Sequence, residues 1–145
     1  MCGIAGLMTT RRDGPDPSVL SALGEALAHR GPDGRRHYLV GNVGLVHNRL
    51  AIIDLETGSQ PLFEPGGAAI VVNGEIYNYI ELRRELHGVN LATNSDCEPP
   101  LHLFRRLGLG FVDKLRGMYA LAIHDPKAGQ LVLARDPFGI KPLYY

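Results

Sequence analysis

Short strand-like runs, separated by turn residues and by few helical segments, are the feature that most limits the folds open to this chain. These runs lie at 4–8, 37–40, 43–47, 68–72, 118–123 and 131–134. Gly41 and Asn42 join the second and third runs, and a two-residue loop of this composition is typical of a β-hairpin. The run 68–72 is expected to end abruptly at Asn73 and Gly74. The pattern predicts an α+β domain with largely antiparallel sheets.

Three segments are expected to form helices. Asp16 is a candidate N-cap with Pro17 at the first helical position, and the apolar stripe of this helix would be formed by Val19, Leu20, Leu23 and Leu27. The segments 81–86 and 98–107 are the other two. Pro99 and Pro100 restrict the residues that precede them, so the last helix is expected to start late.

Composition excludes several classes of function. Lys and Arg number 15, and so do Asp and Glu, which leaves no basic field for a nucleic acid backbone. No apolar run is long enough to span a bilayer, and the start lacks a secretory signal, so a cytoplasmic location is expected. The two cysteines, Cys2 and Cys97, form no CxxC pair. Their number would allow one disulfide, but they are expected to stay reduced. The six histidines form no ligand pattern, and no metal site is predicted.

Cys2 is the first candidate for chemistry, because it directly follows the initiator Met1. Removal of Met1 would leave a thiol and a free α-amine on one carbon. Reference pKa values for such groups are about 8.5 and about 7.7–8.0, close to neutrality, where a nucleophile and a base are useful. The alternative is that Cys2 is a small apolar residue at the start of a buried strand.

Arg49 is a lone cation entering an apolar segment. Its planar guanidinium suits a carboxylate, and Arg is rarely buried without a partner. Two interpretations stay open at this point: a ligand carboxylate, or a salt bridge to an internal acid such as Asp54.

Two further segments carry polar groups with alternative roles. Asn73 and Gly74 form either a simple turn or the pair of amide donors that an oxyanion hole requires. Ser95 or Asp96 would cap the following helix, or Asp96 would bind a substrate ammonium. Together with Cys2 and Arg49, these groups point to an amino acid whose side-chain carbonyl is attacked.

Motifs along the whole chain carry a family resemblance. They are MCGIAG at 1–6, HRGPDG at 29–34, HNRLAIID at 47–54, VNGEIYN at 72–78, SDCE at 95–98, RGMYALAIHD at 116–125 and RDPFGIKPLYY at 135–145. On these residues the chain resembles the glutaminase domain of class II (N-terminal nucleophile) glutamine amidotransferases, specifically that of glutamine-hydrolysing asparagine synthetases. The resemblance implies the four-layer αββα sandwich of N-terminal nucleophile hydrolases, with residues 1–145 as the glutaminase domain.

The resemblance also implies roles for individual residues. Cys2 would be the nucleophile after Met1 removal, its α-amine would take the thiol proton through a water, and Asn73 and the Gly74 N–H would hold the oxyanion. Glutamine would be bound by the Arg49 side chain, by the backbone of Leu50, Ala51, Ile52 and Ile53, by Asn73 and Gly74, and at its ammonium end by Glu75 and Asp96. No metal or cofactor is expected in this domain.

Members of this family continue into an ATP-dependent synthetase domain that makes asparagine from aspartate and ammonia. The chain stops within the strand-like residues 142–145, so it is expected to be truncated at its C-terminal end. A synthetase domain, with its ATP and magnesium, is expected as a partner in cis or in trans, and a homodimer is a further possibility. The alternatives are a non-catalytic fragment or interaction module, an amidotransferase domain that serves another acceptor, and a hydrolase of the same fold that cleaves another amide.

Overall fold

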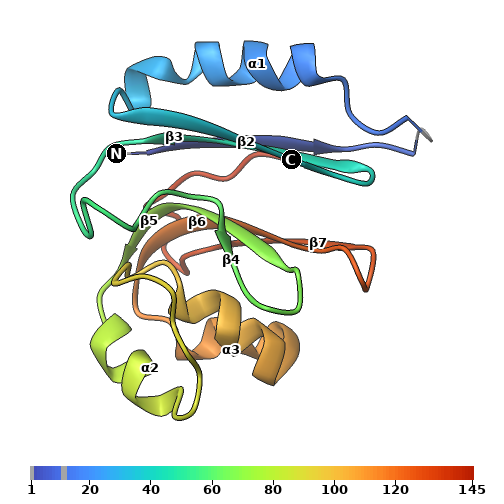
Figure 1. Ribbon diagram of the computed structural model, residues 1–145. Coiled ribbons are helices and arrows are strands. Elements are labelled where there is room, and N and C mark those ends of the chain that lie inside the picture. The colour runs from blue at the N-terminus through green and yellow to red at the C-terminus, as the bar shows by residue number, and fades with distance from the viewer. Residues whose placement is uncertain (1, 11–12) are drawn as a thin grey trace.

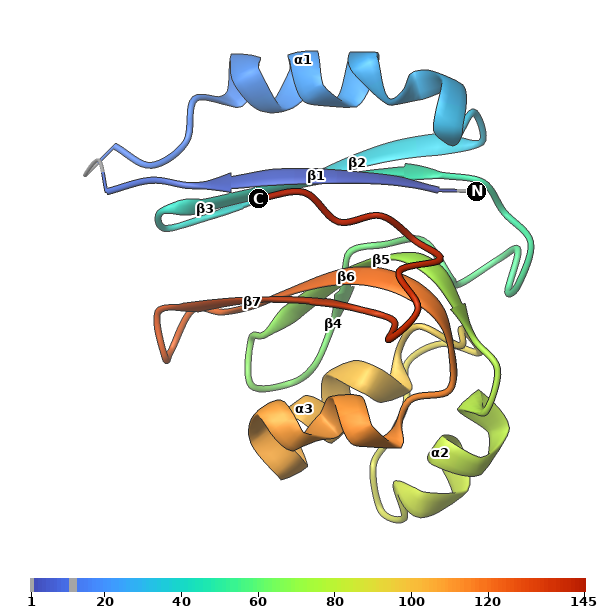
Figure 2. The same cartoon turned by 180° about the vertical axis from the view of Figure 1, so that it is seen from behind.

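Two antiparallel sheets pack face to face between helices in the computed structural model, which describes residues 2–10 and 13–145. Figures 1 and 2 show the layers in order: helix α1, a three-stranded sheet, a four-stranded sheet, and helices α2 and α3. The predicted α+β class with antiparallel sheets is therefore confirmed.

The three-stranded sheet has the order β1 (Gly3–Met8), β3 (Val43–Arg49), β2 (Gly34–Val40). The predicted hairpin is present: Val40 pairs with Val43, and Gly41 takes a positive φ of 58° in the turn. Helix α1 (Pro17–Ala26) covers the outer face and leads into a short 3₁₀ turn, η1 (Ala28–Arg30). Asp16 caps α1 as predicted, accepting a hydrogen bond from the Ser18 N–H at 2.8 Å.

The buried stripe of α1 is narrower than the sequence suggested. Leu20 is fully buried, but Val19 is 43% exposed. The reason is that α1 lies on a single sheet and has nothing on its other side, so only one narrow face of the helix is covered.

The four-stranded sheet has the order β4 (Leu62–Phe63), β5 (Ala69–Ile76), β6 (Gly117–Asp125), β7 (Gln130–Arg135). The prediction that the run 68–72 ends at Asn73 and Gly74 is wrong, since β5 continues through them to Ile76. Both residues pair with β6, and a Cβ on Gly74 would lie only 2.2 Å from the Met118 carbonyl oxygen. Glycine is required there for close backbone packing and not for a turn.

The helical layer on the outer face of the four-stranded sheet contains α2 (Tyr79–Glu85), α3 (Pro99–Leu107) and a 3₁₀ segment, η2 (Gly108–Lys114). Both predicted helices are confirmed. The expected late start of α3 is wrong, because Pro99 and Pro100 themselves form its first turn, where backbone N–H groups have no partner within the helix.

Strand β5 contributes to two separate cores. Ile70, Val72 and Ile76 belong to the larger core, which packs against the helices, whereas Ala69 and Val71 belong to the smaller core between the two sheets. This alternation is the period-two pattern of a strand buried on both faces. Side chains of adjacent β5 residues therefore point into different compartments.

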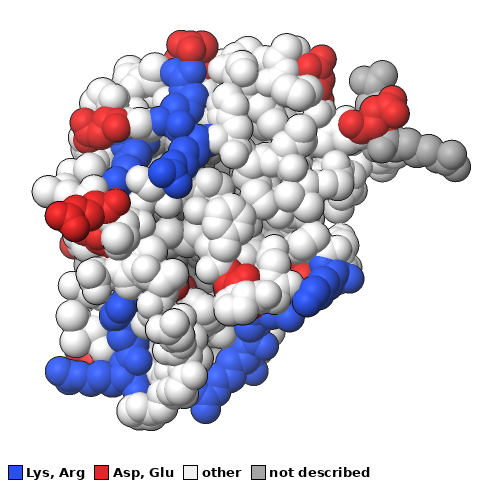
Figure 3. Space-filling model, in the orientation of Figure 1, with Lys and Arg blue, Asp and Glu red and all other residues white. Residues whose placement is uncertain are grey.

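Residues 142–145 continue beyond β7 without forming a strand, so their strand-like sequence did not predict their structure. Tyr144 is 89% exposed. On the face drawn in Figure 3, side chains of both charges are present, and Lys and Arg lie both on the side of α1 and on the side of α2 and α3. In the described part of the chain, no helix has the length and apolar character that a membrane crossing needs.

Truncation of the Leu101 side chain, which α3 buries in the larger core, is expected to destabilise the fold strongly. Leu101 is completely buried, so Leu101→Ala should lower the free energy of unfolding by about 2–5 kcal/mol, measured by urea denaturation. Leu109, which is 61% exposed on η2, is the matched control, and Leu109→Ala should change it by less than about 0.5 kcal/mol. Equal effects of the two substitutions would contradict the core assignment.

Candidate active site

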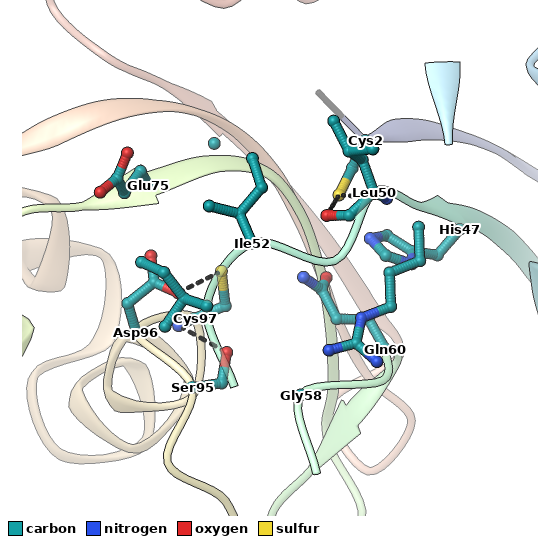
Figure 4. A pocket seen from close by; sticks show the side chains of 13 residues that line it. Cys2, His47, Leu50, Ile52, Gly58, Gln60, Glu75, Ser95, Asp96 and Cys97 are labelled. Atoms are coloured by element: carbon teal, nitrogen blue, oxygen red, sulfur yellow. Dashed lines mark hydrogen bonds between the residues drawn. The ribbon is translucent and has the colours of Figure 1, made fainter. Parts of the chain in front are cut away.

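A pocket opens at the end of the sandwich where β1 and β3 of one sheet meet β5 of the other (Figure 4). It gathers most of the residues that the sequence proposed for a site. The pocket is lined by Cys2, His47, Arg49, Leu50, Ile52, Ile53, Gly58, Gln60, Gly74, Glu75, Ser95, Asp96 and Cys97. Segments far apart in the sequence therefore converge, as the motif analysis predicted.

Cys2 lies immediately before β1 and is half-buried against the backbone of Leu50. The Leu50 N–H donates to Cys2 Sγ at 3.4 Å, and the thiol donates to the Leu50 carbonyl at 3.6 Å. The thiol is therefore held at the pocket wall with its sulfur near a backbone donor. Met1, whose removal the prediction requires, lies outside the described residues.

The loop after β3 is anchored by Asp33. The Asp33 N–H donates to the Arg49 carbonyl at 2.9 Å, and Asp33 Oδ2 accepts from the Ala51 N–H at 2.8 Å. Ala51, whose N–H is bound by Asp33, does not line the pocket, unlike Leu50, Ile52 and Ile53. Ile52 is 65% exposed at the pocket.

Arg49 is held by the loop that follows it. Its Nη1 donates to the Leu55 carbonyl at 3.2 Å and to Ser59 Oγ at 3.0 Å, and its Nη2 donates to the Asp54 carbonyl. The alternative of a salt bridge to the Asp54 carboxylate is wrong, since the described residues contain no ion pair of Arg49 with a carboxylate. The carboxylate of Asp54 instead accepts from Thr57 and Asn94. These three hydrogen bonds leave at least one N–H of the guanidinium for a ligand.

The outer edge of β5 presents backbone donors to the pocket. The Val72 N–H donates to Gln60 Oε1 at 2.5 Å, and the Ile76 N–H donates to Asp96 Oδ2 at 2.8 Å. N–H groups of alternate residues in a strand point to the same edge, so the Gly74 N–H lies between these two. Unlike the N–H groups of Val72 and Ile76, the Gly74 N–H donates a hydrogen bond to no atom in the described residues.

The backbone opposite Gly74 agrees with this direction. Tyr119, the partner of Gly74 on β6, turns both of its backbone groups to Asp136: its N–H donates to Asp136 Oδ2 at 3.2 Å, and its carbonyl accepts from the Asp136 N–H at 2.8 Å. Neither group is therefore available to Gly74, whose N–H faces the pocket.

The Asn73 side chain lies on the face of β5 that is turned toward the three-stranded sheet. It is 8% exposed, and its Oδ1 is buried without a protein partner. Asn73 lines a second cavity, of about 740 Å³ between the sheets, which Cys2 also lines. Cys2 thus borders both the space next to the Asn73 carboxamide and the space next to Gly74.

The acidic end of the pocket is built by residues 95–98. Ser95 and Asp96 do not cap α3, so that alternative is wrong: Ser95 Oγ accepts from the Cys97 N–H at 3.1 Å, and Asp96 accepts from β5. Burial raises the pKa of Asp96, although hydrogen bonds from Ile76 and Cys97 oppose the rise. Glu98, 1% exposed, fixes the preceding loop by accepting from the N–H groups of residues 92 and 93 at 2.7 and 2.8 Å.

The two cysteines of the chain face the same pocket in different states. Both are free thiols. Cys97 is buried, and this burial, together with the Asp96 charge, raises the pKa of its thiol well above the usual value. Cys97 therefore stays protonated, which leaves the half-buried Cys2 as the candidate nucleophile.

His47 and Gln60 line the pocket but were not singled out from the sequence. His47 is 1% exposed and its Nε2 has no protein partner. Burial lowers the pKa of His47 to about 4, and the Arg49 charge adds to this, although a hydrogen bond to the Val72 backbone opposes it. The ring is therefore neutral at pH 7. The available signals were the position of His47 two residues before Arg49 and that of Gln60 directly before Pro61.

No cluster of three or more His, Cys, Asp or Glu side chains suited to a metal ion occurs among residues 2–10 and 13–145. The polar groups of the pocket are instead backbone N–H donors, a guanidinium, carboxylates and a thiol. Such a set can bind an α-amino acid and attack a carbonyl carbon.

Comparison with protein families and curated proteins agrees with this chemistry. The model of a glutamine amidotransferase domain matches residues 1–145. The chain is 43% identical over 149 residues to asparagine synthetase [glutamine-hydrolyzing] 2 of Bacillus subtilis (strain 168), covering 100% of this chain and 20% of that protein. It is 40% identical over 146 residues to asparagine synthetase [glutamine-hydrolyzing] 1 of Arabidopsis thaliana, covering 99% and 25%.

Another relative carries a different name. Amidase chry2 of Gibberella zeae is 40% identical over 160 residues, covering 100% of this chain and 24% of that protein. The chain therefore spans only a fifth to a quarter of the length of these curated relatives.

Solved structures show the same relationship at lower identity. Glutamine phosphoribosylpyrophosphate amidotransferase from B. subtilis superposes with a TM-score of 0.55 and 27% identity, covering 70% of this chain and 24% of that one. A structure described as the allosteric regulatory enzyme of purine biosynthesis gives a TM-score of 0.58 and 28% identity, covering 70% and 25%.

The lowered pKa of His47 predicts that the folded protein loses stability as the pH falls. In the unfolded chain the ring takes up a proton below about pH 6.5, whereas in the folded protein it does so only near 4. The unfolded state therefore binds more protons in this window, and the free energy of unfolding should fall by about 3 kcal/mol from this residue as the pH drops from 7 to 4.

The measurement is urea denaturation at several pH values. His47→Gln should flatten the dependence on pH, whereas His87→Gln, at an exposed position, should leave it unchanged. Identical slopes for the parent protein and His47→Gln would contradict the prediction.

Proposed function

The chain belongs to the glutamine amidotransferase domain family, and we propose that it is a glutaminase domain that hydrolyses free glutamine through Cys2. The observation that carries the proposal is the convergence of Cys2, Arg49, Gly74 and Asp96 on one pocket. A thiol, a guanidinium, an unpartnered N–H and a carboxylate match the carboxamide, the α-carboxylate and the α-ammonium of glutamine.

Binding uses the two ends of the pocket. Arg49, whose guanidinium pairs with no carboxylate in the described residues, takes the α-carboxylate of glutamine. Asp96 and Glu75 take the α-ammonium group. The backbone of Leu50–Ile53 lies along the substrate, although Ala51 contributes only through the geometry of the loop.

The reaction proceeds through a thioester. Removal of Met1 frees the Cys2 α-amine, which accepts the thiol proton through a water. The sulfur attacks the side-chain carbonyl carbon, and the oxyanion is held by the Gly74 N–H and the Asn73 carboxamide. The C–N bond breaks, the nitrogen receives the proton, and ammonia leaves. Water then attacks the γ-glutamyl thioester, which releases glutamate and restores the thiol.

The wider context of the reaction follows from the relatives. The αββα order of the layers and the likeness to glutamine phosphoribosylpyrophosphate amidotransferase support the fold of an N-terminal nucleophile hydrolase, with residues 1–145 as the glutaminase domain. The ammonia goes to an ATP-dependent synthetase domain, in cis or in trans, which amidates aspartate and alone requires ATP and magnesium. The names of the asparagine synthetase relatives support this acceptor.

A second candidate is an amidotransferase domain that serves another acceptor. The relative named an amidase, 40% identical over the whole chain, favours it. The glutaminase chemistry is the same in both cases.

Affinity labelling tests the proposed function. A diazo-ketone analogue of glutamine should alkylate Cys2 alone, seen as a single adduct by intact mass and peptide mapping, on a chain that has lost Met1. Cys2→Ser should take up no label, and Cys97 is the internal control because its thiol is buried and protonated. A processed chain that takes up no label, or takes it up only at Cys97, would refute the assignment.

Loss of the Asn73 carboxamide should slow turnover and leave the fold intact. Removing one oxyanion donor typically costs about 10²–10³-fold in rate, so Asn73→Ala should lower kcat for glutamine by that factor, with an unchanged circular dichroism spectrum. Asn90→Ala, at an exposed position, is the control. Near-normal glutaminase activity of Asn73→Ala would count against the proposed oxyanion hole.

A further inference from the structure

We propose that Gln60 is a positioning residue, whose side-chain oxygen fixes the edge of β5 so that the Gly74 N–H points at the substrate carbonyl. The inference rests on the proposed function, because it concerns how the oxyanion donor of that site is held. Gln60 lies before β4, outside the regular sheet.

The edge of β5 creates the need for such a residue. Strand β4 pairs only with Ala69 and Ile70, so β5 has no neighbouring strand on that side from Val72 onward. Val72 is 1% exposed, and a buried N–H without a partner is costly. Gln60 supplies the missing acceptor at 2.5 Å.

The surroundings of Gln60 fix its direction. Its side chain is 5% exposed and lines two cavities, the pocket that holds Cys2 and a neighbouring cavity of about 200 Å³. Its Oε1 is bound by the Val72 N–H, and its NH₂ group donates to no atom in the described part of the chain. The one contact that orients the carboxamide is therefore the contact with β5.

The position of the contact links it to the reaction. Val72 lies two residues before Gly74 on the same edge, and Asp96 fixes Ile76 two residues after it. The two side chains hold the strand on both sides of the free N–H. Oxyanion stabilisation depends on a donor fixed in advance at the right place, so a strand released at Val72 would lose rate and not substrate affinity.

Two substitutions separate this role from simple packing. Gln60→Glu keeps an acceptor for the Val72 N–H, whereas Gln60→Met keeps the length of the side chain and removes the acceptor. We expect Gln60→Met to lower kcat for glutamine at least 10-fold with KM within about threefold, and Gln60→Glu to keep kcat within about threefold. Equal kcat in Gln60→Met and the parent protein, or equal loss in both variants, would overturn the inference.

Amide hydrogen exchange by NMR gives a readout that does not need activity. In Gln60→Met the Val72 amide should exchange at least 10-fold faster, and in Gln60→Glu it should stay protected. The amide of Leu121, the β6 partner of Val72, is the reference for opening of the whole sheet. If Val72 exchange is unchanged, or rises only as much as that of Leu121, the inference fails.

The two readouts also separate the inference from the proposed function. A parent protein that binds no diazo-ketone and hydrolyses no glutamine would refute the function, while the exchange data would still decide whether Gln60 fixes the strand. If Gln60→Met does not fold, Gln60→Asn replaces it, because its carboxamide is one methylene too short to reach the Val72 N–H.

Discussion

The unpaired edge of β5 is the constraint on which the pocket depends. Strand β4 covers only the beginning of this edge, and the backbone N–H groups beyond it are too deeply buried to be left to water. Gln60 and Asp96 come from segments far apart in the chain and satisfy the N–H groups of Val72 and Ile76. The remaining N–H, that of Gly74, faces the pocket. The site therefore contains one backbone N–H without an acceptor, on a strand edge whose neighbouring N–H groups are hydrogen-bonded. Gln60 and Asp96, which bind those neighbours, fix the strand on both sides of it.

The packing of the two sheets places a thiol at the same pocket as this N–H. Cys2 leads into β1 of one sheet, and Gly74 lies on β5 of the other, so the facing sheets place both residues at the same pocket. Asn73 lies on the same face of β5 as Val71 and lines the cavity between the sheets, whereas the Gly74 N–H points along the edge of the strand to the pocket. One dipeptide thus offers a side-chain amide and a backbone amide on either side of Cys2.

The sequence predicted the features that depend on local chemistry. The hairpin at Gly41, the Asp16 cap and the helices each follow from neighbouring residues, and all are present. The wrong expectation for Asn73 and Gly74 has a non-local cause: Asn-Gly normally forms a turn, but here both residues are extended and pair with β6. The expected salt bridge between Arg49 and the Asp54 carboxylate is wrong for a similar reason, because the guanidinium donates to backbone carbonyls of a loop that forms only in the fold. Gln60 was missed since its partner, Val72, becomes a neighbour only in the fold. The convergence of the motifs could be predicted from their resemblance to a family, not from spacing.

Asp96 shows how the site binds charge at a cost to the empty protein. Burial raises the pKa of its carboxyl, so the folded chain without ligand disfavours the charged form that a substrate ammonium requires. Hydrogen bonds from Ile76 and Cys97 offset part of this penalty, and no cation in the described residues pairs with it. An arriving ammonium would supply the missing positive charge and return the pKa toward its ordinary range. In the proposed function, the Asp96 carboxylate and the Arg49 guanidinium, which form no ion pair in the described residues, would each gain a partner of opposite charge when a zwitterion binds between them.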